Sequence, residues 1–266
     1  MRRGLGPLET TLFAYAQLRG LTTVRAGELR GPLRLSAVQE RKLFNRMARA
    51  GLLSRVWRGI YLVPPRLPLG GKWSPDEALA LNALMASQEA RYQVCGPNAF
   101  NRYGFDDQVP NRVYAYNDRI SGERTVGAVA LTLIKVGIKR LGETEKALTA
   151  DGLTTLYSSR ARTLVDAVYD WSRFNGLPRA FEWIRAELAE KRVGAADLVR
   201  VTLRYGDVGT IRRIGALLDR EGVPDTLLRR LLRALKPTTG LIAWSPVRPR
   251  RGTVDRRWGV VWNDRA

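Results

Sequence analysis

Residues 36–63 read SAVQERKLFNRMARAGLLSRVWRGIYLV and contain the strongest pattern of secondary structure in the chain. Ser36 can cap the start of a helix, and the side chain of Gln39 can accept a hydrogen bond from the Ser36 amide, which makes a capping box. Gly51 is the kind of residue that follows the last turn of a helix. The stretch therefore predicts a helix that begins after Ser36 and ends before Gly51.

A hairpin is expected directly after this helix. Leu52–Trp57 and Ile60–Val63 have the composition of strands. Between them, Arg58-Gly59 can form the bend, because glycine accepts a positive φ angle. The Pro64-Pro65 pair that follows cannot donate backbone hydrogen bonds, so strand pairing ends there.

One face of the expected helix is apolar and the other is cationic. At 100° per residue, Leu43, Phe44 and Met47 share one arc. Glu40 falls on this apolar side, where the positive end of the helix dipole would partly offset its charge. The opposite arc carries Gln39, Arg41, Lys42, Asn45, Arg46 and Arg49.

The cationic face favours contact with nucleic acid. A helix face that merely sits in water usually mixes acidic and basic residues, whereas this face has four cations and no carboxylate. The hairpin adds Arg55, Trp57 and Arg58 at positions expected to be exposed. A solvated cationic surface is the alternative, and the combination of helix and hairpin favours DNA over it.

The residues before this stretch complete a small domain. Pro7–Arg19 has helical character, and Thr22 or Thr23 can cap a short helix that ends near Leu29. Three helices and a hairpin within about sixty residues are the layout of a winged helix-turn-helix domain, whose third helix enters the major groove. Pro64–Lys72 is rich in proline and glycine and is interpreted as a linker. We therefore expect residues 1–68 to form a DNA-binding domain.

The positive charge of the chain is concentrated at its two ends. Residues 1–72 carry 14 Lys and Arg against three Asp and Glu, residues 73–235 carry 24 against 20, and residues 236–266 carry seven against two. Such a field attracts polyanions and speeds their capture. Auxiliary phosphate contacts are expected from Arg2 and Arg3, and from Arg248, Arg250 and Arg251 in the loop VRPRRGTVDRR.

Several classes of site are excluded by composition. The chain has no histidine, which removes imidazole chemistry and histidine-containing metal sites, and it has no phosphate-binding glycine motif. We therefore predict no catalytic residue, cofactor or metal. Cys95 is expected to be a buried structural thiol, and Asp166 and Asp170 to form a solvated acidic face. With a single cysteine, no long apolar run and no signal peptide, we expect a cytoplasmic protein without a membrane partner.

The second domain, residues 69–266, is expected to be mixed α/β and mostly helical, so that the whole chain is α+β. A capping box at Ser74 and Glu77 opens it. Helices are predicted over 74–89, 97–103, 161–169, 177–188, 195–205, 207–220 and 225–235. Strands are predicted over 92–95, 112–117, 125–136, 241–244 and 258–262.

Four runs, in order along the chain, resemble the AbiEi antitoxins of bacterial type IV toxin-antitoxin systems. They are RMARAGLLSRVWRGIYLV (46–63), YSSRARTLVDAVYDWSRFNGL (157–177), TIRRIGALLDREGV (210–223) and RWGVVWN (257–263). The resemblance covers about Leu8–Asn263. It implies an N-terminal winged helix that binds inverted repeats in its own promoter. It also implies a C-terminal domain that counteracts a nucleotidyltransferase toxin, with or without a stable complex.

Carried over by position, the resemblance places Arg41, Lys42, Asn45, Arg46 and Arg49 on the recognition helix and Arg55, Trp57 and Arg58 on the wing. The segment from Arg162 to Asp166 and the pair Arg212-Arg213 match the C-terminal pattern without an assigned chemistry. Ala161 stands where such patterns often have Glu.

The expected function is therefore a DNA-binding antitoxin that represses its own operon and is not an enzyme. Arg46 and Arg49 are candidates for guanine contacts and Asn45 for adenine, while Lys42, Arg55 and Arg58 would bind phosphates. Three alternatives stay open: a stand-alone winged-helix transcriptional regulator, a kinase-like antitoxin that modifies its toxin, and an antitoxin that acts by protein binding alone.

Overall fold

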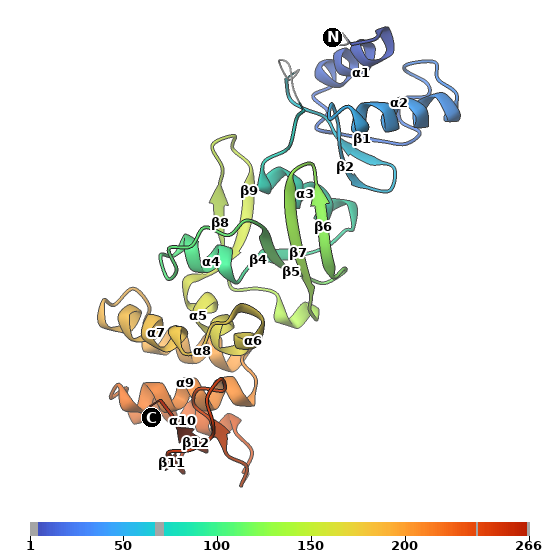
Figure 1. Ribbon diagram of the computed structural model, residues 1–266. Helices are drawn as coiled ribbons and strands as arrows, with labels where there is room; N and C mark the ends of the chain where they lie inside the picture. Colours follow the sequence, from blue (N-terminus) through green and yellow to red (C-terminus); the bar gives the residue numbers. More distant parts are fainter. Residues whose placement is uncertain (1–4, 67–71, 238, 265–266) are drawn as a thin grey trace. The chain divides into compact units, whose positions relative to one another are not determined.

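The structure is a computed structural model that describes residues 5–66, 72–237 and 239–264 (Figure 1). It is a mixed α+β fold, as expected. The chain forms two compact units. The first comprises Met1–Tyr92, Asn111–Leu141 and Lys146–Thr155, and the second comprises Gln93–Pro110, Gly142–Glu145 and Leu156–Ala266. These limits differ from the predicted domains, residues 1–68 and 69–266. That division stays a prediction.

The first unit begins with two helices and a small antiparallel sheet. Its elements are α1 (Pro7–Leu18), β1 (Thr23–Arg25), α2 (Ala37–Arg49), β2 (Ser54–Trp57) and β3 (Ile60–Leu62). The strands lie in the order β1-β3-β2, with Thr23 opposite Leu62 and Ser54 also opposite Leu62 on the other side. The hairpin predicted after α2 is confirmed.

The capping box that opens α2 is confirmed. The Gln39 amide donates to Ser36 Oγ at 3.2 Å, and the Ser36 amide donates to Gln39 Oε1 at 2.8 Å. Leu43, Phe44 and Met47 are buried, as the apolar arc predicts. They pack in one core with α1 and β1, whose contributions include Leu12, Phe13, Ala16 and Val24.

The short helix expected up to Leu29 is wrong. Residues 23–25 form β1, in which Val24 is fully buried, and residues 26–34 form turns. A strand is favoured here because Thr23–Arg25 can complete the backbone hydrogen bonds of β3 while Val24 enters the core.

Hydrogen bonds, and not the helix dipole alone, explain why Glu40 can lie on the buried side of α2. Its side chain is 1% exposed, and its carboxylate accepts hydrogen bonds from the Gly27 amide (2.8 Å), the Leu29 amide (3.0 Å) and Arg30 Nε (3.2 Å). The carboxylate thus satisfies the backbone of the turns before α2, which is why an acidic residue occupies the buried side of a helix.

The rest of the first unit is built around a hairpin and a parallel strand. It contains α3 (Glu77–Ser87), β5 (Val113–Asn117), β6 (Gly122–Val126), β7 (Val129–Lys135) and the 3-10 helix η1 (Ile138–Arg140). β7 lies between β6, its antiparallel partner, and β5, its parallel partner. The expectation of a single strand over 125–136 is wrong, because Gly127, at φ +63°, lets the chain reverse between β6 and β7.

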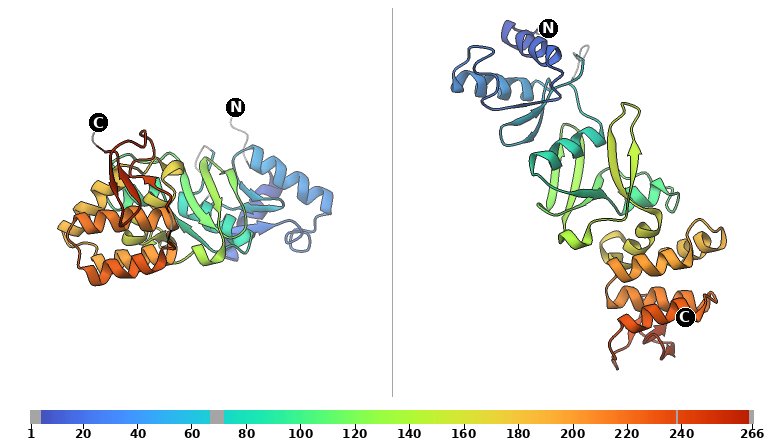
Figure 2. Two further views of the ribbon diagram at one scale, coloured as in Figure 1. Left: turned by 90° about the horizontal axis from the view of Figure 1, so that it is seen from below. Right: turned by 180° about the vertical axis from the view of Figure 1, so that it is seen from behind.

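The second unit is mostly helical (Figure 2). α5 packs against α7, α8 and α9, and α10 packs against α8 and α9. The helices predicted over 161–169, 177–188, 195–205, 207–220 and 225–235 are confirmed. The elements are α4 (Pro97–Arg102), α5 (Arg160–Tyr169), α6 (Trp171–Phe174), α7 (Arg179–Ala189), α8 (Ala195–Tyr205), α9 (Val208–Arg220) and α10 (Asp225–Ala234).

Short strands precede and follow these helices in the chain. Val94 of β4 (Tyr92–Val94) pairs in parallel with Tyr157 of β9 (Thr154–Ser158), and β8 (Thr144–Leu148) precedes β9. Near the C-terminus β10 (Ile242–Ala243), β11 (Thr253–Asp255) and β12 (Val260–Trp262) form a sheet in the order β10-β12-β11. β8, β9 and β11 were not expected, because they are short segments without a clear alternation of apolar residues. Cys95, which follows β4, is buried as expected.

The solvated acidic face expected at Asp166 and Asp170 is wrong. Asp166 is fully buried and its Oδ1 lies 2.9 Å from Nε of Arg162, which is also fully buried. Asp170 is half-buried beside Arg173. The ion pair with Arg162 explains how a carboxylate can lie in the core of the helical unit.

Arg212 and Arg213, which had no assigned chemistry, connect α9 to the C-terminal strands. Arg212 donates to the Gly240 carbonyl at 2.8 Å, and Arg213 donates to the Ala243 and Trp244 carbonyls at 3.1–3.3 Å. Burial lowers the pKa of Arg213 from its ordinary value. These contacts give the arginine pair a structural role.

Candidate nucleic-acid interface

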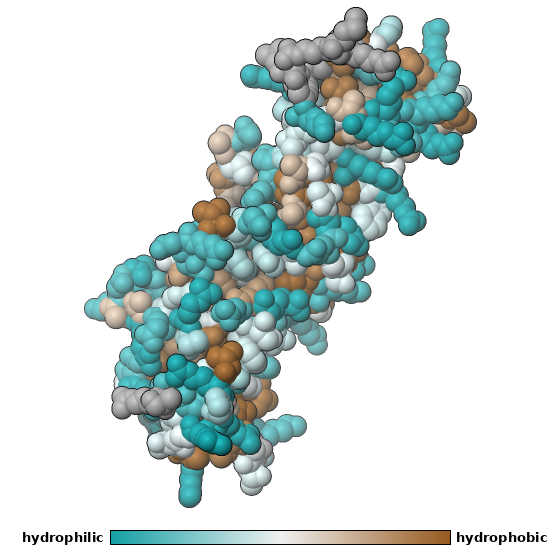
Figure 3. All heavy atoms as spheres, viewed as in Figure 1, coloured by the Kyte–Doolittle hydropathy of each residue, from teal (hydrophilic) through white to brown (hydrophobic). Residues whose placement is uncertain are grey.

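The polar face of α2 is exposed over its whole length. Arg41, Lys42, Asn45, Arg46 and Arg49 are all exposed residues, as expected. Gln39 is exposed too, but its side-chain oxygen is held by the capping box. Figure 3 shows hydrophilic residues over the part of the surface that Figure 1 labels α2 and β2.

A groove separates this face of α2 from the hairpin. Arg41 and Asn45 line it from α2, and Arg55 and Tyr61 line it from the strands. Its volume is about 490 Å³. Arg30 also lines it, although its Nε is 3.2 Å from the carboxylate of Glu40. The groove therefore brings together an exposed amide and two arginines that have no ion pair among the residues that the structure describes.

Among the described residues, Arg46 is the one predicted contact residue of α2 that forms an ion pair. Both its Nε and one terminal nitrogen lie 2.7 Å from Oε1 of Glu9 on α1. The pair is partly exposed, so it contributes little to stability. A guanine contact by Arg46 would require this guanidinium to leave Glu9.

The hairpin residues differ in their surroundings. Arg58 is exposed at the bend, next to Gly59 at φ +73°. Arg55 is exposed and its Nε donates to the Trp57 carbonyl at 3.4 Å. Trp57 is only half-buried, and the guanidinium of Arg124 on β6 lies 5.8 Å from the centre of its ring. Trp57 thus contacts β6, and this limits its freedom to contact DNA.

Residues 5–66 differ from the second unit in how many of their cations are ion-paired. The carboxylates of residues 5–66 are Glu9, Glu28 and Glu40, and each already binds a group of the same segment. By contrast, many arginines of the second unit are ion-paired, including Arg160, Arg179, Arg185, Arg192 and Arg200. Within the described ranges, no ion pair is formed by Arg41, Lys42, Arg49, Arg55 or Arg58.

The auxiliary arginines are less available than expected. Arg2 and Arg3 lie outside the described residues. Arg248 donates to the Asp264 carbonyl at 2.7 Å, and Arg250 donates to the Leu241 carbonyl at 2.8 Å. These bonds hold both side chains against the C-terminal segment, while Arg251 is exposed.

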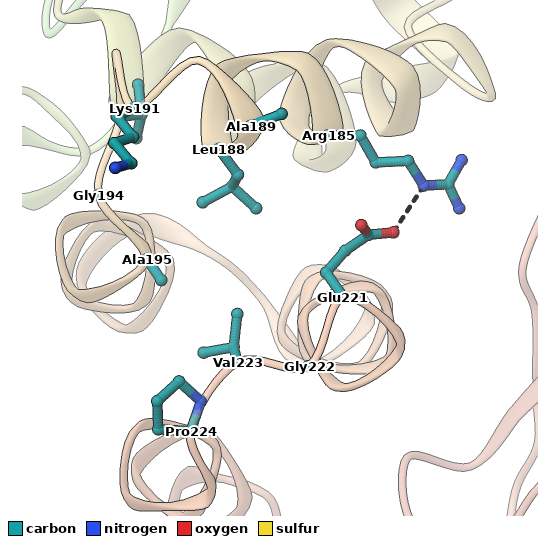
Figure 4. A pocket seen from close by; sticks show the side chains of 11 residues that line it. Arg185, Leu188, Ala189, Lys191, Gly194, Ala195, Glu221, Gly222, Val223 and Pro224 are labelled. Atoms are coloured by element: carbon teal, nitrogen blue, oxygen red, sulfur yellow. Dashed lines mark hydrogen bonds and ion pairs between the residues drawn. The ribbon is translucent and has the colours of Figure 1, made fainter.

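A pocket in the second unit has a volume of about 460 Å³ and is lined by residues of α7, α8 and the α9–α10 connection (Figure 4). Leu188 and Val223 point into it, and Arg185 Nε binds Glu221 Oε1 at 2.8 Å across one side. In residues 5–66, 72–237 and 239–264, no group of three acidic or cysteine side chains could hold a metal ion. The lining of this pocket is apolar apart from Lys191 and the ion pair between Arg185 and Glu221.

The raised pKa of Tyr103 in the second unit also belongs to a structural contact. Burial raises the pKa of the Tyr103 phenol, and the neighbouring charge of Glu145 raises it further. The hydroxyl donates to Glu145 Oε2 (3.0 Å) and to the Ser158 carbonyl (2.9 Å). Tyr103 therefore stays neutral and connects α4 to its neighbours.

No described helix has the length and apolar character needed to cross a bilayer.

Comparisons with known proteins concern the fold of this chain. Residues 35–154 match the model of a family of unknown function, DUF6088. A comparison with curated proteins finds no match. The crystal structure of the RV2827C protein from Mycobacterium tuberculosis is similar, with a TM-score of 0.59 and 15% sequence identity over 97% of this chain and 92% of that chain. The similar architecture thus extends over nearly the full length of both chains.

Proposed function

We propose that this protein binds double-stranded DNA through a winged helix-turn-helix domain at its N-terminus. The order α1, β1, turns, α2, β2, β3 and the strand order β1-β3-β2 support this proposal. In such a domain the recognition helix enters the major groove and the hairpin after it is the wing. Here α2 would be the recognition helix and β2–β3 the wing, although turns at residues 26–34 replace the helix expected before α2. The observation that carries the proposal is the set of exposed cations on α2 and the hairpin, Arg41, Lys42, Arg49, Arg55 and Arg58, which have no ion pair in the described part of the chain.

In this proposal the exposed residues divide into two roles. Asn45 contacts adenine from the groove between α2 and the hairpin, with Arg41 beside it. Arg46 contacts guanine only after it exchanges Glu9 for the base. Lys42, Arg55 and Arg58 contact phosphates, which position the domain on the duplex.

The resemblance to AbiEi antitoxins extends the proposal to a biological role. The DNA is then an inverted repeat in the promoter of the protein's own operon, in the cytoplasm, and the protein represses that operon. The C-terminal domain, residues 69–266, counteracts a nucleotidyltransferase toxin encoded beside it, without chemistry of its own. A gel shift with the upstream DNA and with scrambled DNA at two salt concentrations tests the DNA-binding part. Equal binding of both sequences would contradict the role as a repressor.

Arg58→Ala is expected to weaken binding to all sequences alike and to lower the slope of log K against log salt concentration by about 1, because it removes one phosphate contact. Lys139→Ala is the matched control, since it removes an exposed cation of η1. Fluorescence anisotropy over a salt series measures both slopes. A slope equal to that of the wild type would remove Arg58 from the interface.

Asn45→Ala is expected to cost about 1–3 kcal/mol of binding free energy on the operator and to relax the preference at one base pair. The reason is that an amide side chain reads adenine through two hydrogen bonds. Competition assays with operators changed at single positions measure the preference. Gln17→Ala, which removes an exposed amide of α1, is the control. If discrimination survives in the Asn45 variant, that residue does not read a base.

The antitoxin role is tested separately from DNA binding. The double variant Arg41→Ala/Asn45→Ala should lose repression but still protect cells in which the toxin is expressed from an independent promoter. The reason is that the resemblance assigns neutralisation to the C-terminal domain, residues 69–266. Growth and a promoter-reporter signal are the two measurements. Loss of protection together with repression would tie neutralisation to the DNA-binding surface. Incubation with toxin, nucleotide and magnesium, followed by intact mass, would expose covalent modification.

A further inference from the structure

A second groove is lined by the C-terminal end of α2, by β2 and by the β6–β7 turn. Its volume is about 500 Å³. Three cations line it, Arg49, Arg55 and Lys72, and none of its lining residues is acidic. Arg55 lines this groove and also the groove that contains Asn45. Arg55 thus links the second groove to the proposed DNA-binding face.

The walls of this second groove are held together by two hydrogen bonds from backbone amides. The Trp73 amide donates to the Gly51 carbonyl at 2.7 Å, and the Ala128 amide donates to Ser74 Oγ at 2.8 Å. Gly127 has φ +63°, and a Cβ atom there would lie 2.7 Å from both Pro75 Cδ and Ser74 Oγ. Only glycine allows the β6–β7 turn to approach so closely, and the groove is therefore formed before any ligand binds.

The polar groups of this groove are suited to an anion. Ser54 is 3% exposed and its hydroxyl has no hydrogen-bond partner among the described residues. Buried hydroxyl groups are usually hydrogen-bonded, so this one has an unused donor beside the groove. Thr125 adds a further hydroxyl, whereas Ser74 Oγ already donates to the Pro75 carbonyl at 3.3 Å and accepts from the Ala128 amide at 2.8 Å. Guanidinium, ammonium and hydroxyl groups are the donors that proteins direct at phosphate oxygens.

We propose that this second groove binds a backbone phosphate of the DNA that α2 contacts, and that Lys72 and the β6–β7 turn belong to the interface. The inference rests on the proposed function. It extends the DNA-binding surface past residue 68, onto a segment that the DUF6088 match, residues 35–154, also includes. It also assigns Arg49 to a phosphate in place of the guanine contact expected from the sequence.

The experiment compares full-length Lys72→Gln with Lys135→Gln, which removes an equal charge at an exposed position of β7. Lys72→Gln should weaken binding about fivefold at 0.15 M salt, for operator and scrambled duplexes alike, and lower the salt slope by about 1. Lys135→Gln should bind as the wild type does. Arg49→Gln should also weaken both duplexes equally, since a phosphate carries no sequence information.

Neutral methylphosphonate linkages, placed singly along the duplex, locate the contact. At one or two positions they should weaken the wild type and have no further effect on Lys72→Gln. Two results would overturn the inference. One is an equal affinity of Lys72→Gln and Lys135→Gln for DNA, and the other is a methylphosphonate effect at every linkage that adds to the effect of Lys72→Gln. Arg58→Ala tests the proposed function independently of either result. A loss confined to the operator in Arg49→Gln would restore that residue to base reading. Failure of the wild type to bind either duplex would instead overturn the proposed function.

Discussion

Replacing Arg162 with methionine is expected to destabilise the second unit by about 3–5 kcal/mol, because it removes one partner of a buried ion pair. Arg162 and Asp166 are both fully buried, and Nε lies 2.9 Å from Oδ1. Arg162 also donates to the Gly142 carbonyl at 3.2 Å, and its guanidinium lies 3.9 Å from the ring centre of Tyr205. Without it, the charge of Asp166 is left buried beside an uncharged side chain.

The comparison that isolates burial is Arg200→Ala. Arg200 pairs with Glu143 at 2.7 Å but is 49% exposed, so its loss should cost less than about 1 kcal/mol. Urea unfolding of the full-length chain, followed by circular dichroism, measures both variants. The double variant Arg162→Met/Asp166→Leu should recover much of the stability, because no buried charge remains. Equal destabilisation by Arg162→Met and Arg200→Ala would contradict the argument from burial.

Replacing Glu40 with alanine is expected to destabilise the first unit by about 2–4 kcal/mol, because hydrogen bonds to a charged group contribute about 1.5–3 kcal/mol each. The Leu29 amide would be left buried without an acceptor, and the Gly27 amide and Arg30 would lose theirs. DNA binding should weaken as well, since the turns before α2 lose the contact that holds them to the helix. Glu40→Gln should be intermediate, because the amide oxygen can keep one of the bonds.

Glu28→Ala provides the control for this substitution. Glu28 also accepts a backbone hydrogen bond, from the Arg25 amide at 2.7 Å, but it is exposed, so water can replace it. Thermal unfolding and hydrogen exchange of the Gly27 and Leu29 amides measure the two variants. If the exchange of these amides in Glu40→Ala matches that in Glu28→Ala, the carboxylate of Glu40 does not hold the turns.

Local signals in the sequence determined α2, the hairpin and the helices of the second unit. Ser36 and Gln39 form the capping box that their spacing predicts, and Leu43, Phe44 and Met47 are buried together. The exposed cationic face of α2 could also be predicted, because in a helix the spacing of residues along the chain sets which of them share a face. The spacing of residues in the sequence therefore predicts the positive charge of the candidate site without any tertiary contact.

Only the tertiary structure decided which of those residues have partners. Arg46 binds Glu9, 37 residues away, and Glu40 binds amides of turns that the sequence suggested were helical. β1 is a strand because β3 lies beside it, and Asp166 is buried because other helices cover α5. The β6–β7 turn reaches β2 only after folding. Each of these facts depends on contacts between segments distant in the chain, and local spacing does not encode such contacts.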